Sequence, residues 1–218
     1  MSQQDNENPP PYRRIETIGR CNLYLGDCRA ILPHIGTADA VITDPPYGDT
    51  SLAWDSRVSA WLPLVRAALK PSGSLWAFGS MRFFMDTVND FRDARFRYAQ
   101  DNVWEKHNGS SFHADRFKRV HEHAVHFYPT DVAWADIYKK PVTTPDATAR
   151  TVRRKKRPPH TGNIDASSYE SEDGGPRLMR SVQLVRSCHG YAVHPTQKPT
   201  GIVEPLVRYS CPSGGKGA

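Results

Sequence analysis

Long apolar runs and cysteine are both scarce in this sequence of 218 residues. No stretch approaches the ~18 consecutive apolar residues of a membrane-spanning helix, which excludes an integral membrane protein. Residues 1–11 are polar and rich in proline, and they lack the basic start and apolar core of a secretory signal. The four cysteines form no C-x-x-C pair, which disfavours a disulfide scaffold and a four-thiolate zinc site. These absences favour a cytoplasmic protein.

Positive charge is concentrated in one short segment. The chain has 29 Lys and Arg against 23 Asp and Glu, a net charge of +6. Six basic residues and no acidic residue lie between positions 150 and 157, which equals the whole excess: Arg150, Arg153, Arg154, Lys155, Lys156 and Arg157. A basic patch on a neutral body indicates a polyanionic partner such as nucleic acid. The alternative is a basic loop that only water solvates.

Short apolar strands alternate with amphipathic helices in the first 129 residues. Strands are predicted at 22–27, 38–43, 74–78, 100–106 and 123–128, and helices at 58–69 and 81–91. Such alternation is typical of an α/β fold with a largely parallel sheet. Residues 1–14 are expected to form a disordered tail, 15–129 the α/β region, 130–187 a polar insertion, and 188–218 a C-terminal segment with a short helix at 202–209.

The sequence Asp44-Pro45-Pro46-Tyr47 directly follows the predicted strand 38–43, where α/β folds bind ligands. Two adjacent prolines fix the backbone and remove two N–H donors. The loop then offers carbonyl acceptors, one carboxylate and one aromatic ring. Such a loop suits a planar group with an NH2, whose hydrogens the Asp44 carboxylate and a proline carbonyl would accept while Tyr47 stacks on the ring. The alternative is a simple turn with Asp44 as a cap.

A second motif, His194-Pro195-Thr196-Gln197-Lys198-Pro199, precedes the predicted helix 202–209. On its own it could be a rigid, proline-flanked turn that starts this helix. Together the two motifs resemble the amino-methyltransferases that act on exocyclic amines in DNA. They are most similar to the permuted subgroup in which Asp-Pro-Pro-Tyr precedes the cofactor-binding motif. Softer similarities to this family lie at 26–28, 69–75, 103–108 and 121–128, and the resemblance spans about residues 22–211.

The resemblance implies a Rossmann-like, S-adenosylmethionine-dependent methyltransferase fold with its catalytic residues at Asp44, Pro45, Pro46 and Tyr47. It implies that Asp44 and the Pro45 carbonyl accept the amine hydrogens and that Tyr47 holds an extruded base. An aspartate at the first motif position favours adenine N6 over cytosine N4. The cofactor-binding residues implied are Asp27 near the adenine end, with Asp44, Thr196, Gln197, Lys198 and Pro199 near the methionine end.

The resemblance also implies partners. Double-stranded DNA would bind the basic residues 150–157, which fall in the region where this family varies to recognise sequence. A bacterial or phage modification system would add a cognate restriction endonuclease, and a homodimer is a further option. No membrane partner and no metal are expected: the histidines at 121, 123 and 126 lack the spacing of H-E-x-x-H.

One family feature is expected to be missing. After the helix that follows the second motif, the family has a strand and a glycine-rich loop, of the pattern GD.VLDPF.GSGTT, whereas this sequence reads only Gly214-Gly215-Lys216-Gly217-Ala218 there. The fold is therefore expected to lack this strand and the strand after it. Three functions remain open: an adenine-N6 methyltransferase, a truncated and catalytically inactive DNA-binding remnant, and a cytosine-N4 methyltransferase.

Overall fold

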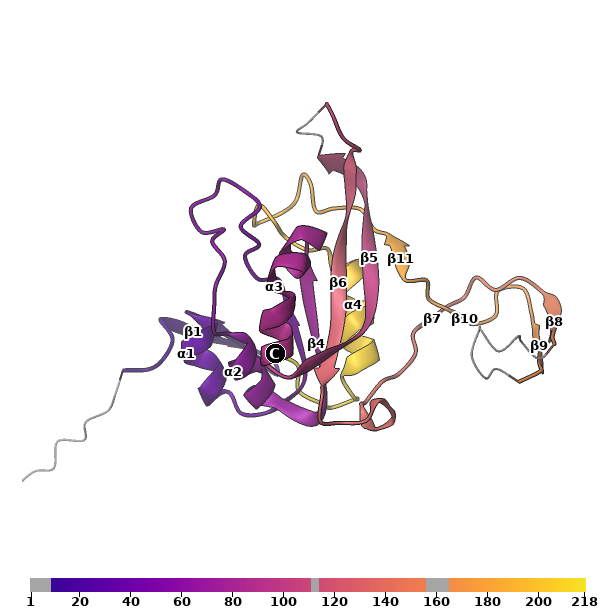
Figure 1. The fold of residues 1–218 in the computed structure, drawn as a ribbon, viewed down its shortest axis with the longest axis horizontal. Coiled ribbons are helices and arrows are strands. Elements are labelled where there is room, and N and C mark those ends of the chain that lie inside the picture. Colours follow the sequence, from indigo (N-terminus) through magenta and orange to yellow (C-terminus); the bar gives the residue numbers. More distant parts are fainter. Residues whose placement is uncertain (1–8, 111–113, 156–164) are drawn as a thin grey trace, which may run out of the picture. The chain divides into compact units, whose positions relative to one another are not determined.

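The computed structural model describes residues 9–110, 114–155 and 165–218. The chain forms two compact units (Figure 1). The main unit comprises Met1–Lys140 and Ser181–Ala218, and the small unit comprises Pro141–Arg180. The small unit lies inside the predicted insertion 130–187; residues 181–184 belong to the main unit because strand β11 (Val182–Leu184) pairs with the main sheet. No helix of the described residues is long and apolar enough to cross a membrane.

A five-stranded sheet with the order β11-β5-β6-β4-β3 organises the main unit. The other strands are β3 (Ala38–Thr43), β4 (Leu69–Gly79), β5 (Phe96–Ser110) and β6 (Arg119–Pro129). The pairs β3–β4 and β11–β5 are parallel, whereas β6 is antiparallel to both β4 and β5. The sheet is mixed, whereas the alternation of elements predicted a largely parallel sheet. The difference arises because β5 and β6 are consecutive strands joined by a short connection.

Alternate residues of β4 pack into two different apolar cores. Leu75 and Ala77 belong to a core with Val65 of α2 (Leu62–Ala68) and Phe83 of α3 (Met81–Asp93). Trp76 and Phe78 belong to a second core, with Ile202 and Leu206 of α4 (Thr200–Ser210). Since successive side chains of a strand point to opposite faces, α2 and α3 cover one face of the sheet and α4 covers the other (Figure 1). Helices on both faces are the layer arrangement of α/β folds.

Local sequence signals explain where the elements begin and end. Ser80 caps α3 by accepting a hydrogen bond from the Phe83 amide. The predicted helix 58–69 is shorter in the structure, because Pro63 lies in the first turn of α2 and proline is tolerated there but not in a helix interior. Leu69 already belongs to β4, which also includes Pro71 and Gly73 and so begins before the predicted strand 74–78.

Among the described residues, three two-stranded pairs lie outside the main sheet. The predicted strand 22–27 is β2 (Cys21–Leu25), which pairs antiparallel with β1 (Arg14–Ile18). Asp27 then caps the short helix α1 (Cys28–Ile31), which continues into a 3-10 turn at Leu32–His34; a second such turn covers Trp134–Asp136. In the small unit, β8 (Arg150–Arg154) pairs with β9 (Ser167–Ser171) and β7 (Thr143–Thr144) with β10 (Arg177–Leu178). These pairs are too short to show a clear apolar period.

Residues 216–218 run beside the outer edge of β3. The Asp39 amide donates to the Lys216 carbonyl at 2.7 Å, and Ala40 and Gly217 form a parallel bridge. The Asp39 carboxylate, buried on β3, accepts from the Lys216 amide at 2.8 Å and pairs with Lys70 at 2.9 Å. This edge of the sheet is therefore partly paired.

Candidate active site

The loop after β3 presents the Asp44 carboxylate beside the Tyr47 hydroxyl. The Tyr47 hydroxyl donates to Asp44 Oδ1 at 2.5 Å, and the Tyr47 ring lies 5.4 Å from that of Phe83. Burial, together with the charge of Asp44, raises the pKa of Tyr47, so this phenol is a neutral donor. The Asp44 side chain keeps 31% of its surface exposed. The carboxylate is therefore held in place and is still accessible.

Lys198 brings the second motif to the same carboxylate. Its Nζ lies 2.7 Å from Asp44 Oδ2, although the two residues are 154 positions apart. The ammonium also lies 5.6 Å from the centre of the Tyr47 ring and 5.5 Å from that of Phe78, within the range of cation–π attraction. The two motifs that the sequence singles out therefore meet in space.

Glu122 and Lys106 extend this charge arrangement, and sequence reasoning assigned no role to either. Glu122, on β6, lies opposite Trp104 of β5, and Lys106 follows two positions later. Lys106 Nζ binds Glu122 Oε1, and Lys198 Nζ lies 3.2 Å from Glu122 Oε2. Burial opposes the charge of Glu122, but the two lysines outweigh it and lower the pKa of this carboxyl. The only sequence signal was that both residues lie in the softer family similarities at 103–108 and 121–128.

Asp55 fixes the backbone that follows Tyr47. Its buried carboxylate accepts from the amides of Gly48 at 2.9 Å, Asp49 at 3.1 Å and Thr50 at 2.8 Å. Burial of the carboxyl works against its charge, yet these hydrogen bonds, with that of the Thr50 hydroxyl, lower its pKa. The loop that follows the first motif is thus ordered from within.

The second motif forms a turn that lines a cavity. The Gln197 side chain accepts from the Val193 amide at 2.9 Å, and the buried Pro199 precedes α4. The His194 ring lies 5.4 Å from that of Trp54, in the loop after Tyr47. Thr196, Gln197 and Lys198 line a cavity of about 540 Å³, whose walls also include Trp104, Lys106, Glu122, Ser187 and Cys188. The cavity is polar and shares Lys198 with Asp44.

The remaining predicted residues lie elsewhere. The Asp27 carboxylate accepts from the Arg29 amide at 2.9 Å and pairs with the Arg29 guanidinium at 2.6 Å, which is a local turn and cap arrangement. Arg150, Arg153 and Arg154 lie on β8 of the small unit, and Lys155 follows directly; Lys156 and Arg157 fall outside the described residues.

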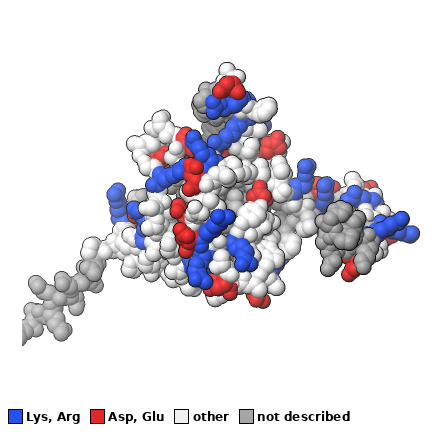
Figure 2. All heavy atoms as spheres, viewed as in Figure 1, with Lys and Arg blue, Asp and Glu red and all other residues white. Residues whose placement is uncertain are grey.

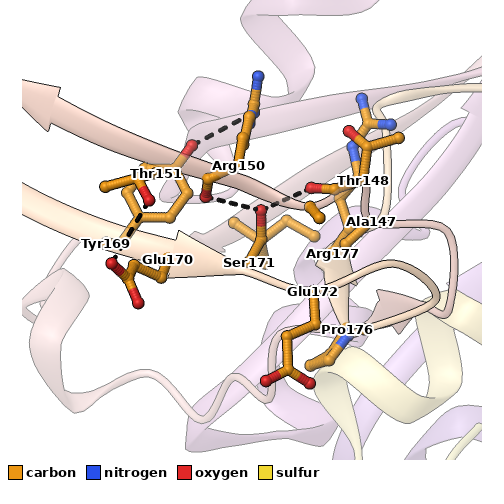
Figure 3. A pocket seen from close by; sticks show the side chains of 13 residues that line it. Ala147, Thr148, Arg150, Thr151, Tyr169, Glu170, Ser171, Glu172, Pro176 and Arg177 are labelled. Atoms are coloured by element: carbon orange, nitrogen blue, oxygen red, sulfur yellow. Dashed lines mark hydrogen bonds between the residues drawn. The ribbon is translucent and has the colours of Figure 1, made fainter.

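The small unit has a hollow of its own, of about 1020 Å³, between the β8–β9 ribbon and residues 175–178 (Figure 3). Arg150 donates to the Tyr169 hydroxyl at 3.2 Å, and Thr151 lies opposite Glu170. The side chains of this hollow combine arginines with polar and acidic groups. On the face of the main unit that Figure 2 shows, basic and acidic side chains are interleaved, as expected for a nearly neutral body.

Similarity to known proteins identifies the family of the chain. The chain matches the DNA methylase family N6_N4_Mtase over residues 38–216. The crystal structure of the M1.HpyAVI–SAM complex resembles it with a TM-score of 0.55 at 19% identity, over 86% of this chain and 76% of that one. A second structure, of M1.HpyAVI, gives 0.53 at 17% identity, over 87% and 75%. The likeness confirms the Rossmann-like methyltransferase fold. Since the family match covers most of its length, the chain belongs to the N6/N4 DNA methylase family.

Proposed function

We propose that this chain transfers a methyl group from S-adenosylmethionine to adenine N6 in double-stranded DNA. The observation that carries the proposal is the Asp44 carboxylate, held at the carboxyl end of β3 between the Tyr47 hydroxyl and the Lys198 ammonium. The carboxyl ends of parallel strands are where α/β folds bind their ligands. Membership in a family of DNA methylases supports the reaction class.

An aromatic amine is a weak nucleophile because its lone pair is delocalised into the ring. Asp44 and the Pro45 carbonyl would accept the two amine hydrogens, which localises the lone pair on nitrogen and orients it. Pro46 keeps this loop rigid, and Tyr47 would support the face of an extruded base. S-adenosylmethionine, when bound, supplies the methyl carbon, and the electron pair of the broken C–S bond remains on sulfur. After the new N–C bond has formed, the cationic nitrogen loses one proton, which passes to solvent water, and the methylated amine is neutral.

The cavity beside Lys198 fits the methionine end of this cofactor. Its volume of about 540 Å³ lies in the range of small-molecule sites. An ammonium from Lys198, a hydroxyl from Thr196 and an amide from Gln197 are suited to a carboxylate and an amino group. Pro199 fixes the backbone before α4. The similar structure of M1.HpyAVI was solved as a SAM complex. We assign Asp27 to the adenine end on the family resemblance.

The test is the identity of the methylated nucleoside. The purified chain is incubated with unmethylated plasmid DNA and S-adenosylmethionine, and the DNA is digested to nucleosides for mass spectrometry. We expect N6-methyladenosine (as the deoxynucleoside), because Asp44 occupies the first motif position. N4-methyldeoxycytidine would establish the cytosine alternative. Unmodified DNA, together with no calorimetric binding of S-adenosylmethionine, would establish the inactive DNA-binding remnant.

We further propose that the basic segment binds DNA phosphates. Replacing Arg150, Arg153 and Lys155 together with glutamine is expected to weaken binding to all DNA sequences. The slope of log affinity against log salt should fall by about 0.9 for each phosphate that the variant no longer neutralises. The measurement is fluorescence anisotropy of a labelled duplex between about 50 and 200 mM salt, the range over which binding through phosphates weakens steeply.

A matched control comes from the main unit. Arg13, Arg14 and Arg20 are also exposed, and their triple glutamine variant has the same net charge as the small-unit variant. We expect its salt slope to stay close to that of the unaltered chain. Equal salt slopes in both variants would show that the basic segment is solvated by water and does not contact DNA phosphates.

A further inference from the structure

The Asp44 carboxylate is already engaged on both oxygens before any base arrives. Oδ1 accepts from the Tyr47 hydroxyl at 2.5 Å, and Oδ2 accepts from the Lys198 ammonium at 2.7 Å. A cation on Oδ2 withdraws the negative charge that the carboxylate would offer to an amine hydrogen. If Asp44 is to receive the amine at full strength, the Lys198 ammonium must move to another acceptor.

Glu122 offers that acceptor at close range. Its Oε1 is occupied by Lys106, whereas the buried Oε2 makes no standard hydrogen bond to any described residue and lies 3.2 Å from the same Lys198 nitrogen. The Lys198–Glu122 contact is an ion pair about 0.5 Å longer than the 2.7 Å pair between Lys198 and Asp44. The Glu122 and Lys198 side chains are only 11% and 10% exposed, so water does little to replace a missing partner. A small rotation of the flexible lysine stem would complete the bond.

We propose that Glu122 is a positioning residue of the methylation site, which draws the Lys198 ammonium away from Asp44 when the target amine binds. The inference rests on the proposed function. Asp44, Lys198, Glu122 and Lys106 form a chain of alternating charges that sums to zero, so the buried charges remain compensated in either arrangement. The ammonium changes its hydrogen-bond acceptor and keeps all of its protons.

The test is Glu122→Gln, which removes the charge and keeps the shape. Without that charge Lys198 remains on Asp44, and we expect the methylation turnover number to fall about tenfold, the factor associated with one charge-assisted hydrogen bond. The KM values for DNA and S-adenosylmethionine should change less than about threefold, since the effect is on the acceptor strength of Asp44. Calorimetric affinity for S-adenosylhomocysteine, a readout without turnover, should likewise stay within about threefold of that of the unaltered chain.

Two further variants separate positioning from support of the fold. Glu122→Asp keeps the charge and should retain at least about a third of the turnover, whereas a purely structural role predicts that it fails as Glu122→Gln does. Asp39→Asn removes another buried carboxylate paired with a lysine, outside the site, and should not lower turnover. If Glu122→Gln does not fold, the Glu122→Asp result alone decides: a tenfold loss there contradicts the charge argument.

The outcomes distinguish this inference from the function on which it rests. An active unaltered chain with Glu122→Gln at full turnover overturns the role of Glu122 and leaves the methyltransferase intact. Equal losses of turnover and of S-adenosylhomocysteine affinity in Glu122→Gln also overturn it, because they indicate a collapsed cavity. An unaltered chain that methylates no DNA overturns the proposed function, and the inference falls with it.

Discussion

Replacing Asp44 with alanine is expected to lower the rate of methyl transfer by at least ~10²-fold, the loss typical of one preorganised polar group in an active site. The carboxylate is the only acidic group that the described structure hydrogen-bonds to both Tyr47 and Lys198. Without it, the amine has the Pro45 carbonyl as its remaining acceptor in this loop, and the lone pair stays delocalised. The measurement is single-turnover transfer of a labelled methyl group to unmethylated DNA.

Asp44→Asn is the sharper variant of the same experiment. Asparagine keeps the size and one acceptor oxygen but presents an NH2 that cannot accept from an amine, so we expect a loss of similar order. Asp131→Ala is the matched control, because that exposed carboxylate pairs only with Arg66 among the described residues. DNA binding by anisotropy should persist in all three variants. Full activity in Asp44→Ala would refute the role that we assign to this residue.

His126 is expected to make the stability of the fold depend on pH. Its ring is fully buried, stacked 4.4 Å from Trp76, and burial lowers its pKa from 6.5 to about 3. Between these two pH values, the His126 ring therefore binds a proton in the unfolded chain and stays neutral in the folded chain. The contribution of His126 to the free energy of unfolding is fully present above pH 6.5 and is lost as the pH falls toward about 3. Between pH 7 and pH 5 the loss from this one group should be roughly 2 kcal/mol.

The measurement is urea unfolding at pH 7 and at pH 5, above the range in which buried carboxyls protonate. His126→Phe preserves the stacked ring and removes the titration, so its unfolding free energy should change about 2 kcal/mol less between these two pH values. The substitution costs no hydrogen bond at Nε2, which has no partner in the described structure. His34→Gln, at an exposed position, should keep the pH dependence of the unaltered chain. An unchanged pH dependence in His126→Phe would show that another group carries the effect.

Local sequence patterns were sufficient where an element depends on its own residues. The strand Ala38–Thr43 was predicted with the observed bounds, because six residues of buried type lead into two prolines that end the pairing. The helix Thr200–Ser210 followed from apolar residues at helical spacing. The proximity of the two motifs came from the family resemblance, and the structure supplies its physical form, the Lys198–Asp44 ion pair.

Pairings between distant segments could not be predicted in this way. Strand β11 pairs with β5 although some 80 residues separate Trp104 from its partner Gln183, and no local pattern encodes such a pair. Glu122 lies between two histidines, and the residues around it have the pattern of a polar strand face. It reaches the site because β6 runs against its neighbours, so its first residues lie where β4 ends: His123 is opposite Gly79. A search that considers only the carboxyl ends of strands therefore misses a site residue near the start of an antiparallel strand.

The three amides that Asp55 holds have a consequence for the kinetics of encounter. Gly48, Asp49 and Thr50 are immobilised by a carboxylate of the same loop, with no help from a ligand. The conformational entropy of this segment is therefore lost during folding, and an arriving nucleotide meets a surface that is already set. Under the proposed function, we therefore expect that this loop does not have to close before a target base can bind.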